Sequence, residues 1–183
     1  SVLFEILSPM GFIPALIEDV SNNLDSISGK MYYADDYRLL KDRDYLVVSD
    51  IAKEGVDDSE YLVYANRADE NIPFDLTIKS EAYSSNFKIQ KNKAVLQCDF
   101  DKLTFPLTLR KWENGDWFVP FGMKGRKKLS DFFSDNKMSL FEKEETWVLL
   151  SDNKIVWIVD RRADDRFRIT DDTKTVYIVS LCK

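Results

Sequence analysis

An apolar stripe between Met10 and Ser28 is the first regular pattern along the chain. Its members recur at steps of three and four residues, which places them on one face of an α-helix. The stripe consists of Ile13, Leu16, Ile17, Val20, Leu24 and Ile27. Pro14 is tolerated near a helix start, and Gly29 supplies a natural stop. We expect a helix over residues 10–28 that covers a sheet of the same chain or, alternatively, uses its apolar face for self-association.

Most of the remaining chain has the pattern of β-strands separated by polar turns. Runs rich in β-branched and aromatic residues alternate with connections rich in Asp, Asn, Gly and Ser. These runs are Tyr45–Ser49, Tyr61–Tyr64, Phe74–Lys79, Lys93–Phe100, Phe105–Lys111, Thr146–Leu150, Lys154–Val159 and Thr175–Leu181. Ser151–Asn153 fits a hairpin turn, and the wholly apolar run Ile155–Val159 suggests a strand covered on both faces. The pattern predicts an α+β fold with largely antiparallel sheets and few helices.

The stretch from Arg110 to Lys137 combines a turn, a basic loop and a helix start. Asn114-Gly115 lies between two strand-like runs, and this dipeptide favours the positive φ angles of a tight hairpin turn. Gly122 and Gly125 permit close backbone approaches in the next loop. That loop carries four cations, Lys124, Arg126, Lys127 and Lys128, and the following Leu129, Phe132 and Phe133 have the spacing of a short amphipathic helix.

Cations at a helix start are electrostatically unfavourable, because the helix dipole favours anions there. A phosphate backbone would relieve the repulsion by binding cations and free N–H groups together, so the stretch suggests an RNA-facing surface. Alternatively, Asp131 and Asp135 balance the cluster and leave a solvated helix end. The spacing of Gly122 and Gly125 does not match a P-loop, which needs a longer glycine spacing ending in Lys-Ser/Thr, so we expect no ATP here.

The same stretch resembles the C-terminal domain of tRNA(Ile)-lysidine synthetases. The resemblance covers residues 106–181 and is carried by Arg110, Trp112, Gly115-Asp116, Phe118, Pro120, Gly122-Met123, Gly125, Lys127-Lys128, Asp131-Phe132-Phe133, Asp135, Lys137, Trp147–Leu149, Ile155–Trp157, Arg161-Arg162, Asp164–Phe167 and Thr170. A weaker resemblance, at Phe4–Leu7, Gly11-Phe12, Ser28–Lys30, Tyr37 and Asp42-Arg43, is to the segment that follows the catalytic domain in this family. The chain therefore looks like a carboxyl-terminal part of such an enzyme.

The resemblance implies a role in tRNA modification. Enzymes of this family use ATP, with magnesium, to adenylate the wobble cytidine of an isoleucine tRNA with a CAU anticodon, and lysine then displaces AMP to give lysidine. The change converts a methionine anticodon into an isoleucine one. Adenylation depends on an amino-terminal domain with an SGG-x-DS loop, and no such string occurs here. We expect no catalytic residue, cofactor or metal site in this chain, and a missing catalytic domain as its partner in cis.

Three regions follow from the resemblance. Residues 1–34 are expected to form a helical connection from the catalytic domain, residues 35–105 a β-rich α+β lobe, and residues 106–183 the tRNA-binding domain, which holds the body of the tRNA. The residues implied to bind tRNA are Lys124, Arg126, Lys127, Lys128, Arg110, Lys137, Arg161, Arg162 and Arg166, with Gly115, Gly122 and Gly125 shaping the loops. The arginines after residue 160 are interleaved with acids, so internal ion pairing is an open alternative for them.

The sequence departs from the family pattern at two places. Asp160 stands where a glycine is expected, and Glu144-Glu145 stand where relatives often carry a basic residue. Both departures add negative charge near the expected tRNA surface.

Net charge is distributed unevenly along the chain. The whole sequence carries −6, but residues 1–100 hold 10 Lys and Arg against 18 Asp and Glu, a balance of −8, whereas residues 101–183 hold 16 against 14, a balance of +2. RNA affinity depends on local cation density more than on net charge, so the acidic half lowers the expected affinity without excluding binding.

Composition bounds the remaining classes. With 44% hydrophobic residues, the 183-residue chain is expected to build a hydrophobic core. Its apolar runs are too short to span a bilayer, and its first residues lack the basic n-region of a signal peptide. We therefore expect a cytoplasmic protein. Cys98 and Cys182 give neither a disulfide framework nor metal-ligand spacing, and we expect both reduced, with Cys98 in the core. The absence of histidine argues against an autonomous hydrolase.

Two further groups of residues invite sharper functions. The pairs Asp57-Asp58, Asp164-Asp165 and Asp171-Asp172 are interpreted as solvated turns rather than metal or acid–base sites. Trp112, Trp117, Trp147 and Trp157 are interpreted as core rather than base-stacking residues. Two other functions stay open: a protein-interaction domain, which includes a homodimer, and a structural brace for the catalytic part without RNA contact.

Overall fold

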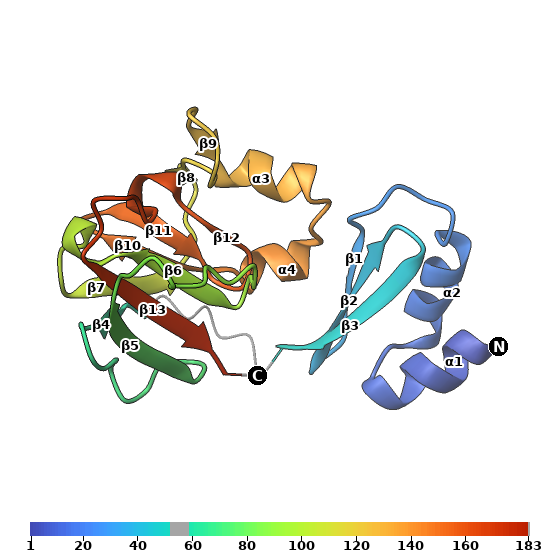
Figure 1. Cartoon of the computed structure of the whole chain (residues 1–183). Coiled ribbons are helices and arrows are strands. Elements are labelled where there is room, and N and C mark those ends of the chain that lie inside the picture. The colour runs from blue at the N-terminus through green and yellow to red at the C-terminus, as the bar shows by residue number, and fades with distance from the viewer. Residues whose placement is uncertain (52–58, 183) are drawn as a thin grey trace. The chain divides into compact units, whose positions relative to one another are not determined.

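The computed structural model describes residues 1–51 and 59–182, so Asp57 and Asp58 lie outside the described residues. The chain divides into two compact units, Ser1–Asp57 with Ser139–Phe141, and Asp58–Met138 with Glu142–Lys183. Every strand pairing among the described residues is antiparallel, and helices are few and short (Figure 1). The predicted α+β class with largely antiparallel sheets is confirmed.

The first unit packs two helices against a small sheet. Its elements are α1 (Val2–Leu7), a 3₁₀ turn η1 (Ser8–Met10), α2 (Pro14–Asn22), β1 (Met31–Tyr33), β2 (Tyr37–Asp42) and β3 (Tyr45–Asp50), with the strands in the order β1-β2-β3. Leu7, Phe12, Ile17 and Val20 meet Tyr32 and Leu39 in one buried cluster. The helices therefore cover the sheet of their own unit, as the apolar stripe predicts for its first half.

Helix α2 is shorter than the apolar stripe predicts. It begins at Pro14, where the missing N–H costs nothing, and it ends at Asn22. The Asn23 side chain donates to the Asp19 carbonyl at 2.7 Å, so it satisfies a terminal helix acceptor and competes with further helical hydrogen bonding. Ile27, which the stripe assigns to the apolar face, is 90% exposed. The prediction of a helix continuing to residue 28 is wrong.

Among the described residues, the second unit contains three sheets and the helix α3 (Leu129–Asp135). The strands are β4 (Tyr61–Val63), β5 (Leu76–Ala82), β6 (Val95–Asp99), β7 (Leu107–Lys111), β8 (Trp117–Phe118), β9 (Lys127–Lys128), β10 (Trp147–Ser151), β11 (Lys154–Ile158), β12 (Arg162–Ala163) and β13 (Thr175–Leu181). The 3₁₀ turns are η3 (Phe100–Lys102) and η4 (Asp165–Phe167). A further short helix, α4 (Leu140–Glu144), has its first two residues in the first unit and the rest in the second. The sheets have the orders β12-β11-β10-β7-β4, β5-β13-β6 and β8-β9.

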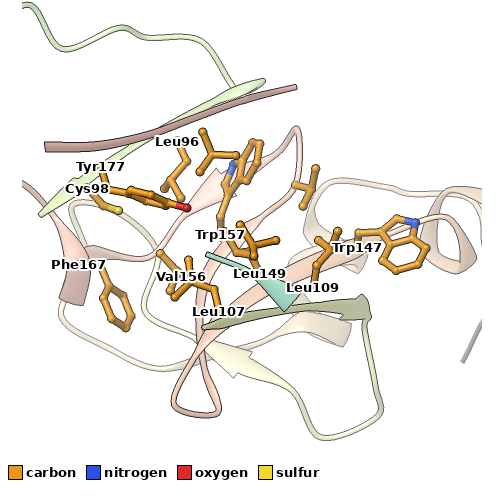
Figure 2. Packing of buried hydrophobic residues seen from close by; sticks show 13 residues of the cluster. Leu96, Cys98, Leu107, Leu109, Trp147, Leu149, Val156, Trp157, Phe167 and Tyr177 are labelled. Carbon is orange, nitrogen blue, oxygen red and sulfur yellow. The ribbon is translucent and has the colours of Figure 1, made fainter. Parts of the chain in front are cut away.

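The five-stranded sheet is covered on both faces. On one face, Leu109, Leu149 and Trp157 pack with Leu96, Cys98 and Tyr177 of the β5-β13-β6 sheet (Figure 2). On the other face, Val148 and Ile158 pack with Phe118, Leu129 and Phe133 of β8 and α3. Successive residues of β10 point to opposite faces, so both faces need apolar side chains. The prediction that the apolar run Ile155–Val159 is covered on both faces is confirmed.

One of the two predicted hairpins forms. β10 and β11 pair, and the two residues between them, Asp152 and Asn153, have φ of 48° and 59°, as in the turns that match strand twist. The turn at Asn114-Gly115 also forms, with Gly115 at φ 98°, but the strands on either side of it do not pair. β7 pairs with β10 and β4, whereas β8 pairs with β9, so the predicted hairpin around Gly115 is wrong.

The two cysteines occupy opposite environments. Cys98 is buried in the sandwich, where burial and the neighbouring Asp99 charge raise the pKa of its thiol, and Cys182 is exposed. Both are free thiols, and Cys98 lies in the core as predicted. No helix in the described parts of the chain combines the length and the apolar character needed to cross a bilayer.

Replacing Leu149 by Ala tests the sandwich. Leu149 is 1% exposed between the two sheets, so truncation removes packed atoms and leaves a cavity. We expect the free energy of unfolding to fall by about 2–5 kcal/mol, measured by urea denaturation followed by tryptophan fluorescence. Ile89→Ala is the control, because Ile89 of the same unit is 57% exposed and its truncation should change stability by no more than about 0.5 kcal/mol. Equal losses for the two variants would contradict the described core.

Candidate nucleic-acid interface

The basic residues singled out by the sequence lie on and around the loop between β8 and α3. This loop opens with a β-turn in which the Met123 N–H donates to the Pro120 carbonyl at 2.8 Å. Gly122 is the third residue of the turn and has φ 83°, a conformation that other residues adopt only with strain. Gly122 thus takes the conformation that the turn requires, whereas Gly125 is exposed and has no positive φ.

A second segment, from β12 to η4, fixes this turn from one side. The Phe121 N–H donates to the Ala163 carbonyl at 3.2 Å, and Arg162 Nη2 donates to the Phe121 carbonyl at 2.8 Å. The Gly122 N–H donates to Asp165 Oδ1 at 2.9 Å. These bonds join segments about forty residues apart in the sequence and fix the backbone at the start of the loop.

Asp164 is the buried centre of this arrangement. Its side chain has no exposed surface, and its Oδ2 accepts from the Val119 N–H at 2.8 Å. Arg166 donates to the same carboxylate through its backbone N–H at 2.8 Å, Nε at 2.9 Å and Nη2 at 2.7 Å. The interpretation of Asp164 as a solvated turn residue is therefore wrong, because β8 and η4 close over it. Asp171 and Asp172 are exposed, as predicted.

The four cations of the loop have different environments. The Lys127 Nζ contacts Asp135 of α3, so the alternative that acids balance the cluster holds for this lysine. Lys124, Arg126 and Lys128 are exposed. Among the residues that the structure describes, Lys124 and Lys128 form no ion pair. Lys128 also stands at the N-cap position of α3, where the dipole favours anions over its ammonium.

Two guanidinium groups lie over the indole of Trp117. Arg126 is 4.1 Å and Arg166 is 4.6 Å from the ring centroid, distances at which cation–π attraction operates. Trp117 is half-buried, whereas Trp147 and Trp157 are core residues as predicted. The stacking holds Arg126 in place while leaving it exposed.

The side chain of Arg110 is largely buried and paired with an acid. Its side chain is only 13% exposed, and it makes a two-pronged ion pair with Asp116, with Nη1 and Nη2 each 2.9 Å from a carboxylate oxygen. These hydrogen bonds raise the pKa of the Arg110 guanidinium. Asp116 also accepts from the Glu113 N–H at 2.8 Å, so the pair braces the turn that contains Gly115.

Among the remaining predicted residues, Arg162 contacts the loop through the Phe121 carbonyl. Arg162 is exposed, and Arg161 lies 3.8 Å from Glu142. Lys137 is exposed just beyond α3 with φ 52°. The alternative of internal pairing thus holds for Arg161 and Arg166. Arg110, for which the sequence suggests no internal pairing, is also paired.

The structure shows the backbone conformation of Asp160 and an ion pair of Glu145, at the two places where the sequence departs from the family pattern. Asp160 has φ 59°, the left-handed region that favours glycine, which explains why a glycine is expected there. Glu145 pairs with Lys111, whose Nζ lies 3.4 Å away and also 4.9 Å from the Trp147 ring. Among the described residues, no group of three or more potential ligands could hold a metal ion.

Sequence reasoning missed the apolar members of the loop. Phe121 and Met123 are both exposed beside the cations. The glycine between them, Gly122, is the sequence signal for a turn here, but it does not reveal that its neighbours are exposed.

Two family models match the chain. One, described as "TilS substrate binding domain", matches residues 1–51, and the other, "TilS substrate C-terminal domain", matches residues 107–180. The chain also resembles a solved structure titled "Crystal structure of TILS C-terminal domain", with a TM-score of 0.51 and 18% identity over 67% of this chain and 95% of that one. At this identity the likeness concerns the fold alone.

Curated relatives match almost the whole chain. A tRNA(Ile)-lysidine synthase of Parabacteroides distasonis is 45% identical over 98% of this chain and 41% of its own length. The tRNA(Ile)-lysidine synthase of Bacteroides thetaiotaomicron is 37% identical over 98% of this chain and 39% of its own length. The chain thus spans about two fifths of these relatives. Together with the two matched domain models, these relatives show that the chain belongs to the tRNA(Ile)-lysidine synthase family.

Proposed function

We propose that this chain is the tRNA-binding part of a tRNA(Ile)-lysidine synthase and is inactive alone. The full enzyme would use ATP and magnesium to join lysine to the wobble cytidine of the CAU anticodon of tRNA(Ile), with a catalytic domain acting in cis. The names of the relatives and of the two domain models support this role. The described residues hold the tRNA in the cytoplasm while the chemistry takes place on the other domain.

The observation that most supports tRNA binding is the group of exposed cations on the loop between β8 and α3. Lys124, Arg126 and Lys128 lie within five residues, directly after a turn that hydrogen bonds from the β12–η4 segment hold, and Lys128 itself lies on β9, which pairs with β8. A preorganised cluster of this kind neutralises phosphates with little ordering of its own backbone. Phosphate contacts fix the position of a nucleic acid but carry no sequence information, so selection of the isoleucine tRNA belongs to other contacts.

The other predicted residues take graded roles in this proposal. Lys127 contributes less than its neighbours, because Asp135 already neutralises it. Arg162 and Lys137 extend the exposed basic surface, while Arg161 and Arg166 share their charge with acids. Arg110 acts through the turn that it braces with Asp116.

Neutralising Lys124 and Lys128 together tests the binding surface. In the Lys124→Gln, Lys128→Gln double variant we expect affinity for tRNA(Ile) with a CAU anticodon to fall by roughly tenfold near 0.1 M salt. The slope of log affinity against log salt should become shallower by about 1.8, because two phosphate contacts are lost. The measurement is fluorescence anisotropy across a salt series.

A matched variant controls for net charge. Lys91 and Lys93 are exposed in the same unit, on the segment before β6, and Lys91→Gln, Lys93→Gln removes the same charge elsewhere. We expect its slope to match that of the wild type. If the two double variants behave alike, or if the wild type shows no salt-sensitive binding, the RNA-binding proposal fails in favour of a protein-interaction or bracing role.

Asp135→Asn tests the partial neutralisation of Lys127. Removing the carboxylate frees one more cation beside the loop, so tRNA affinity should rise by about two- to fivefold with a steeper salt slope. Thermal unfolding should change little, because an exposed ion pair contributes at most about 1 kcal/mol. Asp172→Asn, at an exposed position beyond η4, is the charge-matched control and should leave affinity nearly unchanged. Equal gains in both variants would show a general charge effect instead.

A further inference from the structure

Two large apolar side chains stand exposed on the turn that starts the basic loop. Phe121 is 45% exposed and Met123 is 51% exposed. Phe121 is the only exposed aromatic residue among those that the structure describes in the second unit. Phe121 and Met123 stand exposed together on one ordered turn, and aromatic side chains are enriched at interfaces, so the pair indicates a contact with something outside the chain.

The exposure is not the result of a loose loop. The Phe121 N–H and carbonyl are both hydrogen-bonded, to the Ala163 carbonyl and to Arg162 Nη2. The Gly122 N–H is held by Asp165, and the Met123 N–H closes the turn onto Pro120. The backbone therefore presents Phe121 and Met123 outward in a fixed position, and little conformational entropy remains to be lost on binding.

The surroundings of this turn point to the chemistry of the contact. Lys124 and Arg126 follow directly, so an apolar surface here is flanked by cations. Surfaces that bind single-stranded nucleic acid combine these two features, because cations track the backbone while aromatic rings stack on bases. Trp117, whose ring lies under the guanidinium groups of Arg126 and Arg166, is half-buried, and so is Phe132, whereas Phe118 is fully buried. Phe121 is therefore the aromatic group that is available to a base.

We propose that Phe121, with Met123 on the same turn, is a stacking platform for an unpaired nucleobase of the bound RNA. The proposal rests on the proposed RNA-binding function and adds a contact that phosphate neutralisation does not supply. The nearby cations would hold the backbone of the same nucleotides, and stacking would favour an unpaired base over a base inside a helix without reading its identity.

Paired RNA probes test this contact in the full chain. One probe is a stem-loop with a short single-stranded extension, and the other carries the same extension built from abasic nucleotides, so the two have equal charge. We expect the wild type to bind the first probe about tenfold more tightly. Phe121→Ala should remove that preference, Phe121→Trp should keep it, and neither should change the salt slope. Ile89→Ala serves as the control for loss of an exposed apolar side chain.

The outcomes separate this proposal from the RNA-binding function itself. A wild type that binds both probes equally, or a Phe121→Ala variant that retains the preference, overturns the stacking proposal. In either case the Lys124, Lys128 double variant still reports on phosphate binding through its salt slope. Loss of affinity for both probes in Phe121→Ala would also overturn it, because this result indicates damage to the loop rather than loss of stacking.

Discussion

The buried carboxylate of Asp164 is the constraint on which the geometry of the basic surface depends. A charge without solvent contact is tolerated only where hydrogen bonds replace water, and here the Val119 N–H and three donors of Arg166 do so. These bonds tie the end of β8 to η4, and the adjacent Asp165 extends the tie to Gly122. The position of the loop cations therefore follows from an interaction that itself faces the interior.

In this arrangement, buried residues hold the loop in place and other, exposed residues are available to a ligand. Arg166 neutralises Asp164 and lies over Trp117, which also carries the Arg126 guanidinium, so one buried acid indirectly orients an exposed cation. Arg110 and Asp116 perform the corresponding task at the Gly115 turn. Leu129 and Phe133 then anchor α3 to the five-stranded sheet, which gives the basic segment a rigid base. The surface charge thus rests on two internal ion pairs and one apolar cluster.

Local sequence patterns predicted where strands and turns form better than they predicted which strands pair. The apolar run Ile155–Val159 and the turn at Asp152-Asn153 are defined by neighbouring residues, and both occur as predicted. The Asn114-Gly115 turn also forms, but the strands around it pair with segments distant in the sequence, which dipeptide preference cannot reveal. Helix α2 ends early because a side-chain contact of Asn23 competes with a periodicity that extends to Ile27.

The sequence predicts that the cations of the candidate site lie together. It does not predict which of them are paired with acids and which are exposed. The sequence places Lys124, Lys127 and Lys128 together, yet only the folded chain brings Asp135 to Lys127 and leaves the other two exposed. Asp164 resembles a turn residue because its burial depends on β8, some forty-five residues earlier. Phe121 carried no signal at all, since exposure of an apolar residue is decided by tertiary structure.

The two cysteines differ in their reactivity toward thiol reagents. The reactive form of cysteine is the thiolate, and burial in the sandwich both raises the pKa of Cys98 and shields its sulfur from reagents. Cys182 is exposed at the far end of β13. A maleimide dye should therefore attach to the native chain at one position without mutagenesis, and a second dye on the RNA would turn binding into an energy-transfer signal.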